Sequence, residues 1–267
     1  MKKSLQIANG IAFIFTLIVN YLSNTGKMNG TTIGEVSGGL KTLFTPAGYA
    51  FSIWGVIYLL LFVFILYQGR SLVVRVRDND FVLKIGWWFV ISCLANCFWI
   101  VSWIYGYTAL SCVFIFILLF SILKIILNNK MELWDAPITV IAFLWWPFVL
   151  YAGWVTVASI ANVSAYLVKT NWGGFGIAPF VWTIIMIVIA VIINLIVTWT
   201  RNMREFALVG AWALIAIAIA IANKGVEEQL VYIAYAAAGI LIISSFIHAF
   251  KNRKTAPFIK LREYLKK

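Results

Sequence analysis

The sequence predicts an all-α fold, a polytopic membrane helix bundle of eight spans with both chain ends on the inner side. The composition is 63% hydrophobic and only 11% charged, which is outside the usual range of soluble globular domains. Eight apolar stretches are long enough to cross a bilayer core about 30 Å thick. The basic residues also divide unequally between the two sides of these stretches, as they do in membrane proteins.

The eight predicted spans are separated by short polar connections. The first could pass for a signal peptide, but no small-x-small cleavage site follows it, so we interpret it as a retained helix. Residues 211–225 alternate with a period of two, yet an unpaired strand is excluded from lipid, so a helix is predicted there too. The spans are 5–21, 47–68, 85–105, 109–127, 138–167, 178–200, 207–222 and 230–250.

The distribution of Lys and Arg predicts the orientation. With the N-terminus inside, 17 of the 21 basic residues lie on the inner side, where positive charge is normally in excess. The outer side holds Lys27, Lys41, Lys169 and Lys224. Orientation, with some attraction to anionic lipid, accounts for the net charge of +12. Nucleic acid is not expected as a partner, because the basic residues lie in short loops beside the bilayer.

The predicted membrane interior contains almost no ionisable side chain. Lys84, Lys124 and His248 fall near the inner ends of their spans, where such side chains can reach the headgroups. Transport driven by protons or sodium is therefore not favoured, and a single histidine supports no Ser/His/Asp set. The three cysteines lie within spans and favour buried thiols over a metal site, so no cofactor is required.

Aromatic residues indicate a ligand pocket. Tryptophan usually collects at membrane interfaces, but four of the 13 lie deeper in the spans: Trp54, Trp99, Trp146 and Trp154. A tryptophan inside a bundle offers a flat face and one N–H donor, which suits a flat apolar ligand with few polar edges. Asn96 precedes Trp99 by three residues and Asn162 follows Trp154 by eight, which places each amide on roughly the same helix face as a deep ring.

Three motifs, in order along the chain, carry a family resemblance. The second span opens with Pro46, Gly48, Tyr49, Phe51, Trp54 and Tyr58, the third contains the run from Leu94 to Trp99, and the fifth contains Tyr151, Trp154, Ala158 and Asn162. Together they resemble the TspO/MBR family of tryptophan-rich sensory proteins, which fold as five-helix membrane bundles. The resemblance covers roughly residues 5–169. It implies a TspO/MBR-like five-helix domain at 1–169 and three additional transmembrane helices with a basic tail at 170–267.

Two departures from the family pattern predict local differences. Phe51 and Trp54 are one residue closer than in the family, which would turn Trp54 about 100° away in a regular α-helix. Leu150 replaces the proline that precedes the tyrosine of the fifth helix, so a kink is expected at Pro147, one turn earlier.

The resemblance implies a pocket between the second, third and fifth helices that holds porphyrins and flat hydrophobic drugs, covered by residues 25–43. The implied ligand-binding residues are Pro46, Tyr49, Phe51, Trp54, Tyr58, Asn96, Trp99, Tyr151, Trp154, Ala158 and Asn162. Porphyrin or haem could be the ligand. No iron ligand is expected, because the single histidine, His248, is distant and no methionine lies inside these helices.

Several functions are open on this basis. The leading interpretation is a membrane receptor or sensor for tetrapyrroles or similar flat hydrophobic ligands. The alternatives are a transporter of such solutes, an enzyme that degrades porphyrin with light, and a regulatory membrane scaffold without a ligand. Small residues at Ala213, Ala216 and Ala220 are expected to pack the additional helices onto the core or to serve a homodimer. The expected location is the bacterial cytoplasmic membrane.

Overall fold

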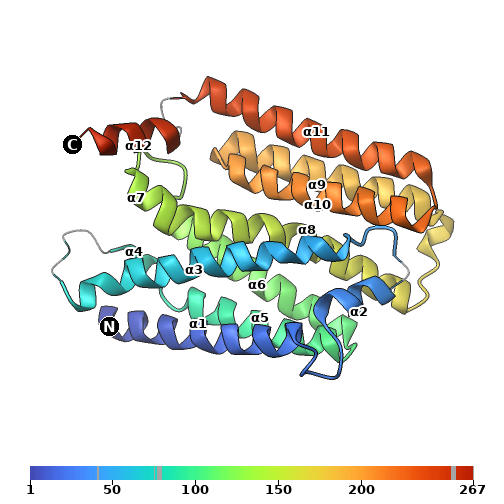
Figure 1. Ribbon diagram of the computed structural model, residues 1–267, viewed down its shortest axis with the longest axis horizontal. Coiled ribbons are helices and arrows are strands. Elements are labelled where there is room, and N and C mark those ends of the chain that lie inside the picture. The colour runs from blue at the N-terminus through green and yellow to red at the C-terminus, as the bar shows by residue number, and fades with distance from the viewer. Residues whose placement is uncertain (41, 75, 77–79, 254–256, 267) are drawn as a thin grey trace.

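The computed structural model describes residues 1–267 except 41, 75, 77–79, 254–256 and 267. Every regular element within the described residues is helical, which confirms the predicted all-α class. The long helices run side by side, and both termini lie at the same end of the bundle (Figure 1). Lys41, one of the outer charges used to predict the orientation, lies outside the described residues.

Seven helical stretches in the described ranges are long and apolar enough to cross a membrane. They are Lys2–Asn24 (α1), Gly48–Leu72 (containing α3, Ile53–Gly69), Thr108–Asn128 (α6), Ile138–Lys169 (containing α7, Ile138–Val140, and α8, Trp146–Lys169), Pro179–Arg201 (α9), Arg204–Lys224 (α10) and Glu228–Lys251 (α11). The remaining predicted span forms α5, Trp88–Ile104, whose 17 residues are at the lower limit for crossing. The chain is therefore a multi-pass integral membrane protein; the count of eight crossings and the orientation stay predictions.

Three shorter α-helices lie between or after the long ones in the described ranges. They are α2 (Ile33–Gly39), α4 (Phe81–Ile85) and α12 (Pro257–Leu265). Gly86, with φ of 55°, separates α4 from α5, since a left-handed residue ends an α-helix. The predicted third span is thus shortened by a turn at its beginning.

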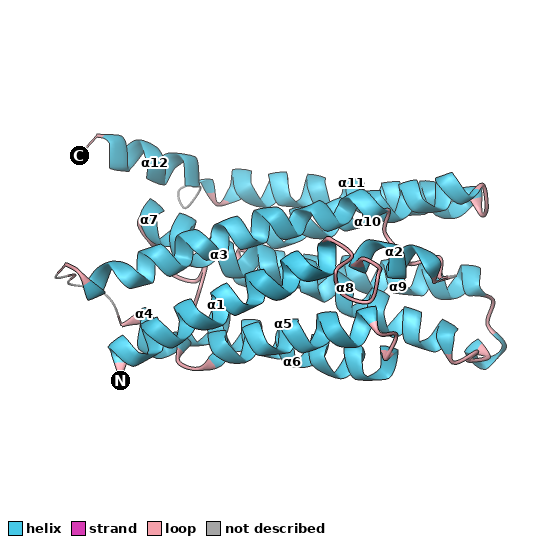
Figure 2. Ribbon diagram, turned by 60° about the horizontal axis from the view of Figure 1, so that its bottom comes forward, coloured by secondary structure: helices cyan, strands magenta, loops and turns pink. Residues whose placement is uncertain are grey.

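The first five long helices form one packed group around α8. α1 packs on α3 and α5, α5 packs on α6, and both α3 and α6 pack on α8. The other three, α9, α10 and α11, pack on one another and join the first group mainly through α10 on α8. α10 and α11 run along each other on one side of the bundle (Figure 2). Ala213 and Ala216 are fully buried, in agreement with the predicted role of these small residues in packing.

A glycine allows α8 and α10 to approach closely. A Cβ built on Gly153 would lie 3.0 Å from the carbonyl oxygen of Phe206 and 3.1 Å from Cβ of Val209. Small residues bring helix backbones together in lipid, where packing rather than water exclusion holds helices. Gly153 therefore brings the additional helices into register with the wall of the site described below.

The fifth long helix is irregular where a kink was predicted. A π-helical turn, Ile141–Trp145, precedes α8, and Pro147 is at the start of α8. Proline has no N–H to donate to the carbonyl four residues earlier, and a wider turn accommodates its ring. The irregular turn therefore lies at Pro147, where the sequence predicted a departure from a regular helix.

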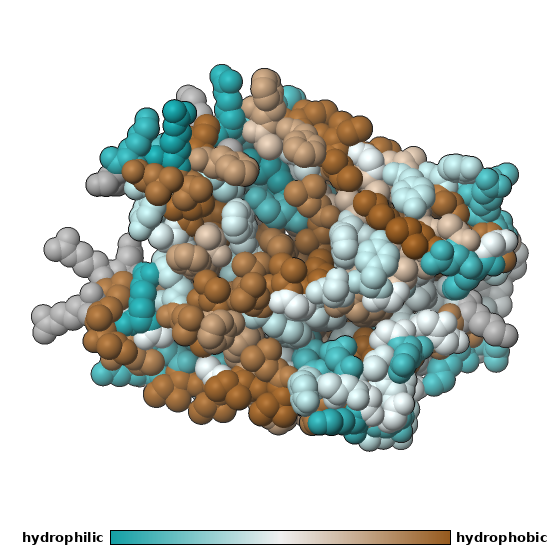
Figure 3. Space-filling model, viewed as in Figure 1, coloured by the Kyte–Doolittle hydropathy of each residue, from teal (hydrophilic) through white to brown (hydrophobic). Residues whose placement is uncertain are grey.

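The surface agrees with a membrane environment. Apolar side chains such as Leu59, Phe62 and Leu66 of α3 are exposed on the outside of the bundle. Hydrophobic residues cover much of the middle of the molecule, and hydrophilic residues gather toward the ends of its long axis (Figure 3). An apolar middle with polar ends matches the profile of a bilayer.

Candidate functional site

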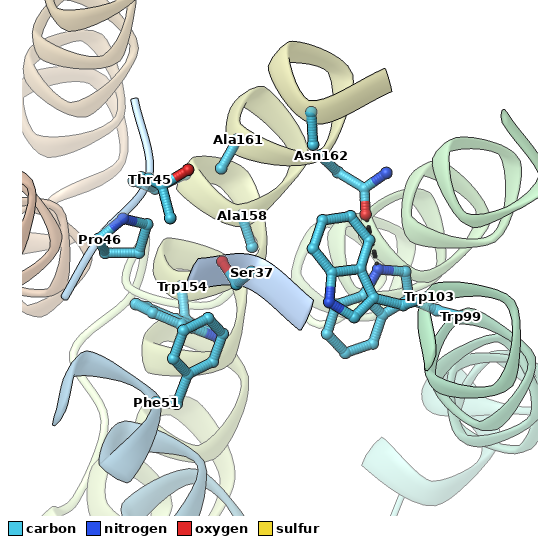
Figure 4. A pocket seen from close by; sticks show the side chains of 12 residues that line it. Ser37, Thr45, Pro46, Phe51, Trp99, Trp103, Trp154, Ala158, Ala161 and Asn162 are labelled. Atoms are coloured by element: carbon cyan, nitrogen blue, oxygen red, sulfur yellow. Dashed lines mark hydrogen bonds between the residues drawn. The ribbon is translucent and has the colours of Figure 1, made fainter. Parts of the chain in front are cut away.

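An aromatic cavity of about 40 Å³ lies near the end of the bundle opposite the termini. Its walls come from α2, the segment before α3, α5 and α8: Ser37, Thr45, Pro46, Phe51, Trp99, Trp103, Trp154, Val157, Ala158, Ala161, Asn162 and Ala165 (Figure 4). A buried water needs roughly 10–15 Å³, so this space would hold a few waters. A larger ligand requires part of the wall to move.

Two pairs of rings face each other across this cavity. Phe51 and Trp154 pack edge to face with ring centroids 5.9 Å apart, and Trp99 and Trp103 stack at 6.4 Å on the other side (Figure 4). The floor between them is formed by small side chains of α8, including Ala158 and Ala161, which follow the spacing of one helix face. The space exists because alanine stands where a larger residue would fill it.

Trp54 is buried in the bundle, and the segment before it is not the regular α-helix for which a rotation of Trp54 was expected. Residues Gly48–Ser52 form a 3₁₀ turn, which winds more tightly than an α-helix, and α3 begins only at Ile53. Trp54 is buried and its ring lies 6.4 Å from that of Trp154, which Phe51 also contacts. The 3₁₀ turn thus compensates for the shortened spacing.

The hydrogen bonds of the wall distinguish Asn162 from Trp154. Nε1 of Trp99 donates to Oδ1 of Asn162 at 2.8 Å, and Nδ2 of Asn162 donates to Oγ of Ser111 at 2.8 Å. The Asn162 amide is therefore engaged in joining α5, α6 and α8. In contrast, Nε1 of Trp154 is buried and has no hydrogen-bond partner among the described residues. It is a free donor on the wall of the cavity.

A layer of hydrogen-bonded polar side chains lies next to the cavity, on the side toward the chain termini. Nδ2 of Asn20 donates to Oδ1 of Asn96 at 3.0 Å, and Nδ2 of Asn96 donates to the hydroxyl of Tyr151 at 3.2 Å. The hydroxyl of Tyr58 donates to Oδ1 of Asn96 at 3.4 Å, and the ring of Trp54 stacks on Tyr58. These side chains fill the space beneath the cavity.

The predicted cover of the site contains the short helix α2. Thr32 and Glu35 form a capping box at its start, and hydrogen bonds from Thr32 lower the pKa of the Glu35 carboxyl. Nε1 of Trp103 donates to the carbonyl of Ile33 at 3.3 Å, and the hydroxyls of Thr42 and Ser164 share a hydrogen bond of 2.8 Å. The cover is thereby attached to both α5 and α8.

The additional helix α10 holds the rim of the site, a role that the sequence reasoning missed. The N–H of Ala47 donates to the carbonyl of Ala216 at 2.9 Å, and Nε1 of Trp212 donates to the carbonyl of Ala50 at 3.3 Å. Nζ of Lys224 donates to the carbonyl of Thr42 at 3.1 Å. The sequence feature that could have indicated this role is Trp212, a single tryptophan among the small residues of α10. We call these three contacts the α10 clamp.

Ten of the eleven predicted site residues fall into two groups, and Tyr49 lies apart from both. Six lie on the cavity wall: Pro46, Phe51, Trp99, Trp154, Ala158 and Asn162. Trp54, Tyr58, Asn96 and Tyr151 lie in the layer beneath it. Tyr49 is 41% exposed and packs edge-on against Trp212 of α10 at 5.2 Å, away from the wall. The cavity wall also contains residues that the motifs did not indicate, among them Ser37, Thr45, Trp103 and Ala161.

The described residues that line the cavity include no His, Cys or Met. His248 is on α11, which contributes nothing to this wall, and no group of three side chains suited to a metal occurs in the described ranges. A ligand there would be held by ring contacts, burial and a few hydrogen bonds.

Comparison with known proteins agrees with these features. No curated protein and no solved structure matches the chain. The family described as TSPO-like protein matches residues 6–247, which includes the aromatic site, the α10 clamp and most of the additional helices. Its match confirms the resemblance to the TspO/MBR family drawn from the three motifs. The chain belongs to the family of TSPO-like proteins.

Proposed function

We propose that the protein is a membrane receptor that binds a tetrapyrrole, or a similarly flat hydrophobic molecule, in the aromatic cavity. Family membership supports a membrane sensor or receptor. The observation that carries the proposal is the unpartnered indole N–H of Trp154 on a wall that also holds Phe51, Trp99 and Trp103. Such a donor among rings suits a planar apolar ligand with polar edges.

Binding requires the cover to move, because a cavity of about 40 Å³ is far smaller than a tetrapyrrole. Residues 42–47 lead into the 3₁₀ turn, and Thr45 and Pro46 of this segment line the cavity. Residues 42–47 are not helical and are held to α8 and α10 by a few hydrogen bonds, so they are the part of the wall that can open most easily.

Binding without transport is supported by the layer beneath the cavity. Trp54, Tyr58, Asn96 and Tyr151 lie directly beneath the cavity, on its side toward the other end of the bundle. A solute moving through would have to separate these hydrogen bonds and rings. We therefore expect saturable binding of protoporphyrin IX to the purified protein and no accumulation of it in reconstituted vesicles.

The test is a titration of the detergent-purified protein with protoporphyrin IX, followed through the porphyrin absorbance. Ala158→Phe fills the cavity and should weaken binding about tenfold or more. Trp154→Phe keeps an aromatic ring but removes the free donor, and should weaken binding severalfold. Trp134→Phe, at an exposed position outside the cavity wall, is the matched control and should bind as wild type. Unchanged affinity in Ala158→Phe would exclude this cavity as the site.

A further inference from the structure

A second and larger space lies at the other end of the bundle. It is an apolar groove of about 290 Å³ between the start of α8, the first turns of α10, the last turns of α11 and the short helix α12. Its apolar walls include Trp146, Leu208, Phe246 and Phe258. The end of the bundle that holds it is the one where both termini lie (Figure 1). The groove is separate from the aromatic cavity and shares no residue with it.

Arg204 lines this groove as a buried cation that forms no ion pair among the described residues. Its side chain is only 5% exposed, and Nη1 has no hydrogen-bond partner in the part of the chain that the structure describes. A buried guanidinium normally binds a carboxylate or a phosphate, because an unpaired charge in low dielectric is costly.

Glu205, the next residue, also lines the groove and is also unsatisfied. Its Oε2 is buried and has no partner among the described residues. Consecutive side chains on an α-helix point about 100° apart, so Arg204 and Glu205 do not meet each other. A third group, Glu132, lies near both. Burial and the neighbouring Glu205 raise its pKa to about 8, although Arg204 partly offsets this rise, and Glu132 forms no ion pair with Arg204 among the described residues.

These groups define the chemistry of an occupant. It needs an anionic oxygen group for Arg204, a cationic N–H donor for Glu205 and an apolar part for the groove. A fatty acid would supply no cation and would add a second negative charge beside Glu205. A phospholipid with a quaternary ammonium has no N–H to donate. A phosphate joined to a primary ammonium matches both side chains, and Arg204 starts α10, where a helix end meets the headgroup region.

We infer that this groove binds a phospholipid with a phosphate and a primary ammonium in its headgroup, as in phosphatidylethanolamine, with the phosphate on Arg204 and the ammonium on Glu205. The acyl chain then lies along Trp146, Leu208 and Phe246. α12 covers the groove with Phe258 and is held in place by Lys260, which forms an ion pair with Asp135 at 2.8 Å.

The inference is tested by native mass spectrometry of the delipidated full-length protein with added lipids that share their acyl chains and differ in headgroup. The probes are phosphatidylethanolamine, phosphatidylglycerol and phosphatidylcholine. Wild type should bind phosphatidylethanolamine about tenfold more tightly than the other two. Equal affinity for all three headgroups would overturn the proposal.

Two substitutions separate the roles of the charges. Glu205→Gln should remove the preference for phosphatidylethanolamine over phosphatidylglycerol, because only the ammonium depends on Glu205. Arg204→Gln should weaken binding of both lipids by about tenfold. The controls are Glu228→Gln in the first turn of α11 and Arg70→Gln, whose guanidinium stacks on Tyr67 at 3.7 Å; neither lines the groove. A preference retained in Glu205→Gln counts against the assignment.

A further variant guards against misfolding of the charge variants. Leu208→Trp fills the groove from a partly exposed position without changing any charge, and should reduce binding of all three lipids. Thermal unfolding of every variant is measured in the same detergent, so that a loss of lipid binding at unchanged stability can be assigned to the groove. Lipid binding in Leu208→Trp equal to that of wild type would place the lipid elsewhere.

Discussion

The indole of Trp99 and the amide of Asn162 form a hydrogen bond of 2.8 Å that joins α5 to α8 at the wall of the aromatic cavity. The same amide donates to Ser111 of α6 at 2.8 Å. A residue that looked like a ligand contact in the sequence therefore also holds three helices together. Substitutions at Asn162 will affect stability as well as binding, which makes Trp154 and Ala158 better probes of the site.

Asn162→Ala should lower the free energy of unfolding by about 1–3 kcal/mol, because it leaves the buried donor of Trp99 without an acceptor. The measurement is unfolding in mixed micelles. Asn128→Ala, which removes an exposed donor to the Lys84 carbonyl, is the control and should change the stability little. If the bond matters as described, Trp99→Phe combined with Asn162→Ala will cost less than the sum of the single changes.

Gly153→Ala should destabilise the protein by about 1–3 kcal/mol, because the added Cβ would press on the backbone of Phe206 in α10. Gly55→Ala on α3 is the matched control: a Cβ there meets nothing within 4 Å, and the change should be neutral or stabilising by up to about 1 kcal/mol. Both are read from thermal unfolding in detergent. Equal effects at the two positions would show that α8 and α10 do not depend on close approach.

Trp212→Phe should loosen the rim of the site, since it removes the hydrogen bond from α10 to the Ala50 carbonyl. Hydrogen exchange of the backbone amides at residues 42–50, and of Ala47 in particular, should become faster. Trp199→Phe removes an indole that donates to Ser244 on α11 and should leave this segment unchanged. The measurement needs no ligand, so it tests the α10 clamp independently of the proposed function.

Stability should fall as the pH rises from about 4.5 to about 8, because Glu132 titrates differently in the two states. Its pKa is raised from 4.5 to about 8 by burial and by Glu205, partly offset by Arg204. In this window the folded state keeps a proton that the unfolded state releases, so stability declines by up to about 1.4 kcal/mol per pH unit and levels off above the folded pKa.

The check on this prediction is the unfolding temperature between pH 5 and pH 9. Glu132→Gln should remove most of the decline, since an amide does not titrate. A variant that declines as steeply as wild type would assign the effect to another group.

Haem and metal-free protoporphyrin IX should bind the aromatic cavity with similar affinity, because its described wall residues offer no His, Cys or Met to iron. The comparison is a pair of absorbance titrations on the same preparation. His248→Ala should leave both affinities unchanged, since α11 does not line the cavity. A large preference for haem that a single substitution abolishes would contradict this account of binding.

Sequence reasoning succeeded where the property is local. Long apolar runs identify helices because a bilayer requires backbone hydrogen bonds to be satisfied within the segment, and all eight predicted spans are helical. The motif residues Phe51, Trp99 and Trp154 all line the same cavity because each motif marks a face of its own helix. The irregular turn near Pro147 also follows from one residue.

The remaining features depend on how helices meet, and periodicity in one segment cannot encode that. The 3₁₀ turn before α3 removed the rotation of Trp54 that a regular α-helix would have produced. Trp103 lines the cavity and its indole N–H donates to the carbonyl of Ile33. Arg204 was counted among the basic residues of the inner loops, but it begins α10 and the helices around it bury its side chain. The sequence by itself determined the helices and the family. Only the packing of α10 against α8 and against the rim of the site decided where the cavity and the groove lie, because contacts between segments distant in the sequence determine which side chains are buried and which side chains they contact.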